Sequence, residues 1–320
     1  MNSHAFFSVY RQHHSPGRAN QQPDEKFLQT EKVFLNIFQV GLFEIYDFLY
    51  SSCRDDDHFS AWLIDLKGRE FYDKALIQFN EWYQSGKQSA DQTFNAVLSP
   101  EQMEFWELNG YLKIEKVIDA RRCDAIVQHI AEELQVDPGN PGTWYQSHPA
   151  LQGMMLQLYQ GEVFDSLRQD PHVRNIFASL YGHGDILPNC DKVSFNPPVN
   201  QYYTFKGSPL HWDIDFSIGP RYYIQGLVYL NDVPTDRGPL TLIPGYHRHI
   251  ENTLSQFSDP EAAMQSLREK KQEIPVPGQQ GDLIVWLESL PHAASPNHSE
   301  LPRFVQYLSF TELKHKTARD

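Results

Sequence analysis

The stretch GDLIVWLESLPHAASPNHSELPRFVQYLSFT, residues 281–311, contains two runs of aliphatic and aromatic residues separated by a segment rich in Pro, Ser and Asn. Short runs of this kind, bounded by Gly, Pro and Asn, are typical of β-strands. The segment between them contains His292 and ends at Arg303. We therefore predict strands over 282–287 and 303–311, joined by a hairpin that returns Arg303 to the pocket that His292 faces.

The same strand pattern begins upstream, near Asp191, after a helical half of the chain. The further predicted strands are KVSFN (192–196), YYIQGLVYLNDV (222–233), PLTLIP (239–244) and QEIPVP (272–277). Six or more short strands after a helical half indicate an α+β protein, with an antiparallel sandwich or double-stranded β-helix (jelly roll) buttressed by helices. A helical insertion over about 250–270 interrupts these strands and is a candidate lid.

The N-terminal part of the chain has a different pattern. Over about 25–82, apolar residues recur at three- and four-residue spacing, which predicts amphipathic helices. The polar residues before this region are expected to be frayed, and SGKQSADQ (85–92) to be a linker. The chain is thus divided into a helical N-terminal extension, 1–95, and a second domain, 96–320. The aromatic stripes of the extension are too apolar to face water, so we expect them to pack on the second domain or on another subunit.

The second domain opens with a helix whose first turn is marked in the sequence. Ser99, Pro100 and Gln102 fit the N-cap, the first helical position and the reciprocal position of a capping box. An Asn-Gly pair would end this helix and lead into a strand. The remaining elements predicted before Asp191 are that strand, 111–114, and helices over 120–135 and 162–182, the last broken near Pro171.

The composition argues against several classes of protein. A formal net charge of −14, without a Lys/Arg cluster, argues against nucleic acid as a partner because phosphate binding needs a basic surface. No apolar run approaches the roughly 20 residues that span a bilayer. The N-terminus lacks a secretory signal, and three widely spaced cysteines argue against a disulfide framework. We therefore expect a cytoplasmic protein without a membrane or nucleic-acid partner.

A candidate metal-binding triplet, His211-Trp212-Asp213, lies between the predicted strands. Residues two apart on a strand project from the same face, so His211 and Asp213 either hold a metal or form a polar pair beside a turn. Two histidines and one carboxylate bind non-haem Fe(II) and leave positions open for a cosubstrate and dioxygen. His292 is the candidate third ligand because it follows a strongly apolar strand. Its competitors lie in turn-rich, polar segments: His247, His249 and His298.

A site of this kind also needs an anchor for the cosubstrate 2-oxoglutarate. Its distal carboxylate is best held by a planar, bidentate cation, and Arg303 begins the strand after His292. Lys192 and Ser194 alternate on one predicted strand and should line the pocket, with Gln225 on the next. For each of these three, contact with 2-oxoglutarate or substrate and simple packing remain open.

Residues from about Leu98 to Phe310 resemble the phytanoyl-CoA dioxygenase family of Fe(II)/2-oxoglutarate oxygenases. The segments that carry the resemblance are LSPEQMEFWELNGYLKI (98–114), HWD (211–213), NDVPTDRGPLTLIPGYHRH (231–249) and GDLIVWLESLPHAASPNHSELPR (281–303). The sequence departs from the family pattern at Trp212, where a small or polar residue is usual, and at Arg237, where Asn is common. The N-terminal extension lies outside the resemblance.

The resemblance implies that His211, Asp213 and His292 bind Fe(II) and that Arg303 holds 2-oxoglutarate. The implied reaction uses dioxygen, releases succinate and CO2, and hydroxylates an unactivated C–H bond of a small-molecule substrate. Halogenases of this superfamily lack the carboxylate ligand, so Asp213 favours hydroxylation over halogenation. Desaturation or cyclisation, a non-catalytic jelly-roll protein that binds a metal or ligand, and a homo-oligomer formed through the N-terminal helices remain open. The substrate is not indicated.

Overall fold

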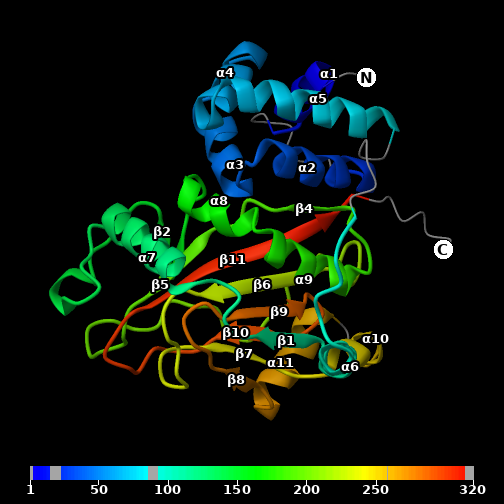
Figure 1. Ribbon diagram of the computed structural model, residues 1–320. Coiled ribbons are helices and arrows are strands. Elements are labelled where there is room, and N and C mark those ends of the chain that lie inside the picture. Colours follow the sequence, from blue (N-terminus) through cyan, green and yellow to red (C-terminus); the bar gives the residue numbers. More distant parts are fainter. Residues whose placement is uncertain (1–2, 15–22, 86–92, 258, 314–320) are drawn as a thin grey trace.

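The structure is a computed structural model that describes residues 3–14, 23–85, 93–257 and 259–313. Five helices form one end of the molecule, and antiparallel sheets with further helices around them form the rest (Figure 1). The predicted linker lies mostly outside the described residues. The N-terminal helices are α1 (Ser3–His13), α2 (Glu25–Phe38), α3 (Leu42–Ser51), α4 (Asp56–Lys67) and α5 (Arg69–Ser85).

The first helix, α1, contradicts the prediction that the segment before residue 25 is frayed. Phe6, Phe7 and Tyr10 are all buried, at 3%, 1% and 0% exposure. Their rings pack against Phe34 of α2, with centroids 5.3–5.6 Å apart. The segment is too polar on average to signal a helix, but three aromatic residues on one face are enough when a second helix covers them.

The aromatic side chains of the N-terminal helices pack mainly against one another. Their core also includes Leu187 and Leu313, which belong to the sheet region. Gln29 Nε2 donates to the Glu312 carbonyl at 3.1 Å, and Trp82 Nε1 donates to the Leu313 carbonyl at 3.4 Å. The helices thus have their own core and are docked on one end of the sheet. Assembly through them into an oligomer stays a prediction.

We expect Phe7→Ala to lower the free energy of unfolding of the helical region by about 3–5 kcal/mol, the usual cost of emptying a buried Phe site. The matched control is Val9→Ala on the same helix, because Val9 is 42% exposed and exposed substitutions change stability by less than about 0.5 kcal/mol. Urea unfolding followed by tryptophan fluorescence measures both. Equal effects of the two substitutions would show that α1 is not part of this core.

The second domain begins as the capping signals predict. Helix α6 (Pro100–Asn109) starts with a reciprocal capping box: Gln102 N donates to Ser99 Oγ at 3.2 Å and Ser99 N donates to the Gln102 side chain at 2.9 Å. The following helices are α7 (Ala120–Leu134), α8 (Glu162–Arg168) and α9 (Pro171–Tyr181), with the predicted break at Pro171. A short 3-10 turn, η1 (Pro141–Thr143), lies after α7.

Two antiparallel sheets form the rest of the domain. The larger sheet has the order β1-β9-β6-β11-β5-β3-β2, with β4 paired to β11, and the smaller has the order β10-β7-β8. The strands of the larger sheet are β1 (Tyr111–Ile114), β2 (Leu151–Gln152), β3 (Met155–Leu156), β4 (Ile186–Pro188), β5 (Val193–Asn196), β6 (Ile224–Tyr229), β9 (Leu283–Leu287) and β11 (Arg303–Glu312). Those of the smaller are β7 (Leu240–Leu242), β8 (Ile274–Val276) and β10 (His292–Ala294).

The two faces of the larger sheet have different neighbours. On β11, Phe304 and Leu308 belong to the core shared with α7, α8 and α9. Val305 belongs instead to a core that joins the two sheets and includes Leu240 and Leu242 of β7. Because side chains alternate along a strand, Arg303, which begins β11, lies on the same face as Val305. The candidate site is therefore on the face that the two sheets share.

The helical insertion between β7 and β8 is present as predicted, as η2 (Tyr246–Arg248), α10 (Ile250–Ser255) and α11 (Pro260–Lys270). Buried residues of α11, including Met264 and Leu267, share an apolar core with Trp212 and its neighbours. Arg268 Nε also donates to the Leu210 carbonyl at 2.9 Å. The insertion therefore supports the loop that carries the candidate triplet. Its action as a lid stays a prediction.

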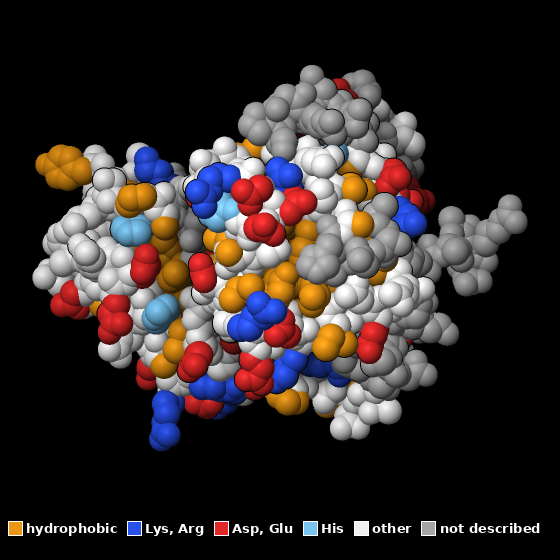
Figure 2. Space-filling model, turned by 90° about the horizontal axis from the view of Figure 1, so that it is seen from above, with side chains coloured by type: hydrophobic (Ala, Val, Ile, Leu, Met, Phe, Trp, Pro, Cys, Tyr) orange, Lys and Arg blue, Asp and Glu red, His pale blue; other side chains and the backbone are white. Residues whose placement is uncertain are grey.

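Two properties of the whole molecule complete the description. No single described helix is long and apolar enough to span a bilayer; α2 and α3 meet the length and composition test only as a pair with a bend of 100° between them. On the face seen from above in Figure 2, Lys and Arg side chains are interspersed with Asp and Glu among the described residues.

Candidate active site

The two histidines of the site are brought together by backbone pairing. His211 N donates to the His292 carbonyl at 3.0 Å, and His292 N donates to the His211 carbonyl at 2.9 Å. This isolated antiparallel bridge places the two ring centroids 4.6 Å apart. The bridge joins residues 81 positions apart in the chain, so the pairing of distant segments, and not the spacing within the triplet, sets this distance.

The expectation that the triplet lies on a strand is wrong. His211 makes only the single bridge, and the chain from Trp212 to Asp215 has no regular secondary structure. The Trp212 side chain is buried against α11, and its Nε1 donates to the Ser289 carbonyl at 3.1 Å. Burial of this large ring turns the chain out of the sheet, and Asp213 then reaches the histidines from a loop.

The orientation of both imidazoles turns Nε2 of each ring toward Asp213. His211 Nδ1 lies 2.8 Å from the Pro209 carbonyl, and His292 Nδ1 lies 3.0 Å from the Leu290 carbonyl. A carbonyl can only accept, so Nδ1 carries a proton, and Nε2 is the nitrogen of each ring that a metal could bind. Each Nε2 lies 3.5 Å from one oxygen of Asp213. The three ligand atoms lie within 4.8 Å of one another, as a metal site requires.

Asp213 is held as a carboxylate. Burial by itself would raise its pKa, but contacts with His211, His292 and Gln225 hold the pKa of Asp213 well below its ordinary value. Burial also acts to lower the pKa of His211, but the neighbouring Asp213 raises it. The Nε2 atoms of His211 and His292 and the carboxylate of Asp213 converge and fit the two-histidine, one-carboxylate set for a divalent iron.

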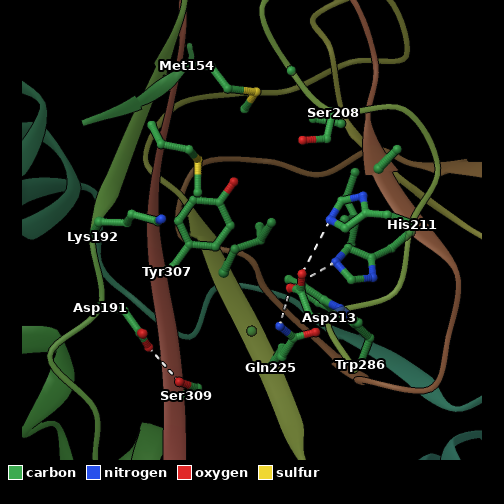
Figure 3. A pocket seen from close by; sticks show the side chains of 18 of the residues that line it. Met154, Asp191, Lys192, Ser208, His211, Asp213, Gln225, Trp286, Tyr307 and Ser309 are labelled. Carbon is green, nitrogen blue, oxygen red and sulfur yellow. Dashed lines mark hydrogen bonds and ion pairs between the residues drawn. The ribbon is translucent and has the colours of Figure 1, made fainter. Parts of the chain in front are cut away.

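Gln225 supports the site from β6. Its Nε2 donates to Asp213 Oδ2 at 2.6 Å, which fixes the direction of the carboxylate (Figure 3). A partner of this kind orients a ligand without touching the metal. The structure thus shows Gln225 in contact with Asp213. Its contact with the cosubstrate stays a prediction.

The triad opens onto a cavity of about 450 Å³. This volume is in the usual range for small-molecule sites. Its walls come from the facing sides of the two sheets and from the loop before His211. Figure 3 shows Lys192, Tyr307 and Ser309 on the wall opposite His211 and Asp213. A ligand in the cavity would thus lie between the triad and β11.

Arg303 reaches the cavity as a buried cation, 1% exposed. Its Nη1 donates to the Gly238 carbonyl, its Nη2 lies 3.9 Å from Met154 Sδ, and its Nε has no hydrogen-bond partner. Within the described part of the chain, no carboxylate forms an ion pair with it. A buried guanidinium without a counter-charge is costly, so these contacts fit a site that an anion completes.

Gly238 matters for this arrangement as well as for the turn. Its φ is +64°, and a Cβ there would lie 2.7 Å from the Ser295 carbonyl oxygen. Its own carbonyl oxygen accepts from Arg303. Glycine is therefore required where the turn approaches the backbone that leads from His292 to Arg303.

The remaining two predicted residues have different positions. Lys192 lines the cavity, and its Nζ lies 4.9 Å from the centroid of the Phe43 ring of α3; burial lowers the pKa of Lys192. Ser194 does not line the cavity, which contradicts the expectation. It pairs with Val305 in the sheet and is wholly buried, with no partner for its Oγ. The Ser194 side chain is covered by residues from other segments of the chain, and the local sequence does not indicate them.

Several cavity residues were missed by sequence reasoning. Tyr307 and Ser309 follow Arg303 at intervals of two on β11, so period-two alternation from Arg303 would have found them. Asp191 also lines the cavity, but it precedes β5 and has no such signal.

Comparison with known proteins agrees with this geometry. The family model for phytanoyl-CoA dioxygenase (PhyH) matches residues 106–305. The chain belongs to the phytanoyl-CoA dioxygenase family. The match includes the triad and Arg303, and it leaves the N-terminal helices α1–α5 outside.

Individual relatives are distant. An ectoine dioxygenase of Stutzerimonas stutzeri (strain A1501) is 27% identical over 197 residues, 58% of this chain and 61% of that enzyme. The chain therefore spans less than two thirds of that relative.

Two solved structures have a related fold. The crystal structure of EctD from S. alaskensis with bound Fe has a TM-score of 0.51 at 20% identity, over 70% of this chain and 80% of that one. The non-heme alpha ketoglutarate dependent carbocyclase SnoK from nogalamycin biosynthesis has a TM-score of 0.52 at 18% identity, over 70% and 88%. At this identity the likeness shows the fold.

Removal of the Gln225 contact should weaken the metal site. We expect Gln225→Leu to lower the affinity for Fe(II) by about 10–100-fold, the usual cost of losing a partner of a metal ligand. Gln128→Leu, an exposed position on α7, is the matched control. Anaerobic Fe(II) titration measures both variants. Wild-type affinity in Gln225→Leu would contradict the orienting role.

Proposed function

We propose that the protein is an Fe(II)- and 2-oxoglutarate-dependent dioxygenase that hydroxylates an unactivated C–H bond of a small molecule, with release of succinate and CO2. One observation carries the proposal. The Nε2 atoms of His211 and His292 and the carboxylate of Asp213 converge on a cavity that Arg303 also lines, and no carboxylate in the described part of the chain forms an ion pair with Arg303. Membership of the phytanoyl-CoA dioxygenase family supports the same reaction class.

The arrangement of the two sheets also supports the proposal. We infer that the two facing antiparallel sheets are a double-stranded β-helix, since their shared core encloses the site between them. The likeness to EctD and SnoK supports this fold. The boundary near residue 95, a location in the cytoplasm and the absence of a nucleic-acid partner stay predictions.

Each residue has a physical task in this reaction. Iron, when bound, supplies the activation of dioxygen and the oxidising power, and His211, Asp213 and His292 would hold it. Arg303 would bind the distal carboxylate of 2-oxoglutarate and so fix its position relative to the triad. The cavity walls exclude water, which limits unproductive reaction and strengthens the charged contacts.

Asp213 bears on the outcome of the reaction. With iron bound, its carboxylate would be a metal ligand where halogenases have none, which supports hydroxylation over halogenation. Desaturation and cyclisation use the same ligands and differ in how the substrate is placed, and SnoK is named a carbocyclase. The mass of the product formed from the true substrate decides among these. A non-catalytic binding protein is less well supported, because the triad and Arg303 are all in place.

The decisive experiment is conversion of 2-oxoglutarate to succinate by the full-length protein in air. We expect slow formation of succinate that requires Fe(II) and does not need the substrate. Protein without added metal is the control. Folded protein that binds Fe(II) and 2-oxoglutarate but forms no succinate would favour the binding-protein alternative.

A further inference from the structure

The cavity wall opposite the triad contains a second carboxylate, Asp191, that the metal site does not use. Its Oδ2 accepts from Ser309 Oγ at 2.6 Å (Figure 3). In the described part of the chain Asp191 forms no ion pair. Burial raises the pKa of Asp191, against the opposing effects of Ser309, Arg168 and Lys192. A partly buried carboxylate that forms no ion pair is a candidate functional group when it lines a cleft.

A hydrogen-bond network fixes the state of this carboxylate. Ser309 Oγ accepts from Asn189 Nδ2 at 2.7 Å and from the Tyr223 hydroxyl at 2.9 Å. Asn189 Oδ1 in turn accepts from Thr311 Oγ1 at 2.8 Å, which fixes the orientation of the amide. The single proton of Ser309 is therefore directed at Asp191. The hydroxyl contact is with Oδ2, and Asp191 lines the cavity.

The register of the sheet pairs the hydrogen-bond partner of Asp191 with the hydrogen-bond partner of Asp213. Ser309 of β11 is paired directly with Gln225 of β6. Gln225 holds Asp213, and Ser309 holds Asp191. Directly opposed residues on neighbouring strands have Cβ atoms about 4.5–5.5 Å apart. A substrate held at Asp191 would therefore extend across the cavity toward the triad.

The missing partner of Asp191 is a cation. The cosubstrate is a dianion, which a carboxylate repels, and Arg303 is the unpaired cation that suits it. Lys192 follows Asp191 in the chain but forms no ion pair with it in the described structure; its ammonium lies over Phe43. The ligand itself must then supply both the positive charge and the N–H donor.

We propose that Asp191 binds a cationic nitrogen of the substrate, so that the enzyme acts on small-molecule amines or guanidines. Ser309 is a positioning residue that keeps one oxygen of Asp191 turned to the cavity. The inference that this ligand is oxidised rests on the proposed function. The binding preference does not, because it depends only on the cavity.

Binding is tested on the full-length protein with Fe(II) and 2-oxoglutarate under anaerobic conditions. The probes are pentylamine, 1-pentanol and pentanoate, which match in length and differ in charge. We expect only pentylamine to raise the melting temperature. Asp191→Asn should weaken pentylamine binding at least about tenfold, since a charged hydrogen bond is lost. Glu104→Gln removes one exposed charge on α6 and should bind pentylamine as the wild type does.

The positioning role is tested separately. Ser309→Ala should weaken pentylamine binding, and Ser309→Thr, which retains the hydroxyl, should restore it. A purely structural role would instead lower the melting temperature of the free protein without changing the preference among the three probes.

The outcomes separate the two proposals. Pentylamine binding that depends on Asp191, in a protein that forms no succinate, would refute the proposed function and keep the amine site. Succinate formation without any preference for pentylamine, or with unchanged pentylamine affinity in Asp191→Asn, would overturn the amine site and keep the function.

Discussion

The His292→Ala variant should form succinate from 2-oxoglutarate at a rate at least about 100-fold below that of the wild type. Loss of an outer partner of a metal ligand already costs 10–100-fold, so loss of a ligand should cost more. His292 is expected to be a ligand because its Nε2 is one of three donor atoms that converge within 4.8 Å. The His211→Ala variant should behave in the same way. Succinate formation and bound iron are measured together on each protein.

His298→Ala is the matched control, because His298 lies six residues further along the chain and is exposed. This variant should retain wild-type iron content and turnover. The folded state of His292→Ala is checked by its circular dichroism, since the lost Nδ1 contact with Leu290 costs only about 1 kcal/mol. Near-normal turnover with iron still bound in His292→Ala or His211→Ala would refute the assignment of the ligands.

The Arg303→Lys variant should need about 10–100-fold more 2-oxoglutarate for half-maximal turnover. Lysine keeps the charge but loses the planar fork that binds a carboxylate through two parallel hydrogen bonds. A charge-assisted hydrogen bond contributes about 1.5–3 kcal/mol, and each 1.4 kcal/mol is a factor of ten. The effect should be large here because Arg303 is 1% exposed and water cannot replace the lost contact. KM for 2-oxoglutarate is the measurement, and kcat should fall less.

An exposed arginine gives the control for this substitution. Arg121→Lys, on the surface of α7, should leave KM for 2-oxoglutarate unchanged. An unchanged KM in Arg303→Lys would mean that another cation anchors the cosubstrate. The other cations that line the cavity are Lys192 and Lys206, and Lys192 would then be the first candidate.

Local signals in the sequence were enough for much of the fold. The capping box at Ser99, the break at Pro171 and the strands that became β5, β6, β7, β8, β9 and β11 all depend on residues within one turn or one strand. Helix α1 was missed because its stability comes from rings on α2 and α5 and not from its own average polarity. The loop conformation of the triplet was missed for the same reason, because Trp212 is buried against α11, which is distant in the sequence.

The sequence by itself determined which residues are candidates to bind iron and 2-oxoglutarate. The order of His211, Asp213, His292 and Arg303, and the apolar strand before His292, are visible without coordinates because ligand type and alternation are local properties. Only the tertiary structure decided how these groups are held and which others join them. The bridge between His211 and His292, the unpaired state of Arg303, the burial of Ser194 and the entry of Asp191 into the cavity each depend on contacts between segments far apart in the chain. The burial of a side chain and the charges around it depend on residues from distant segments, and the pattern along one strand does not reveal those residues.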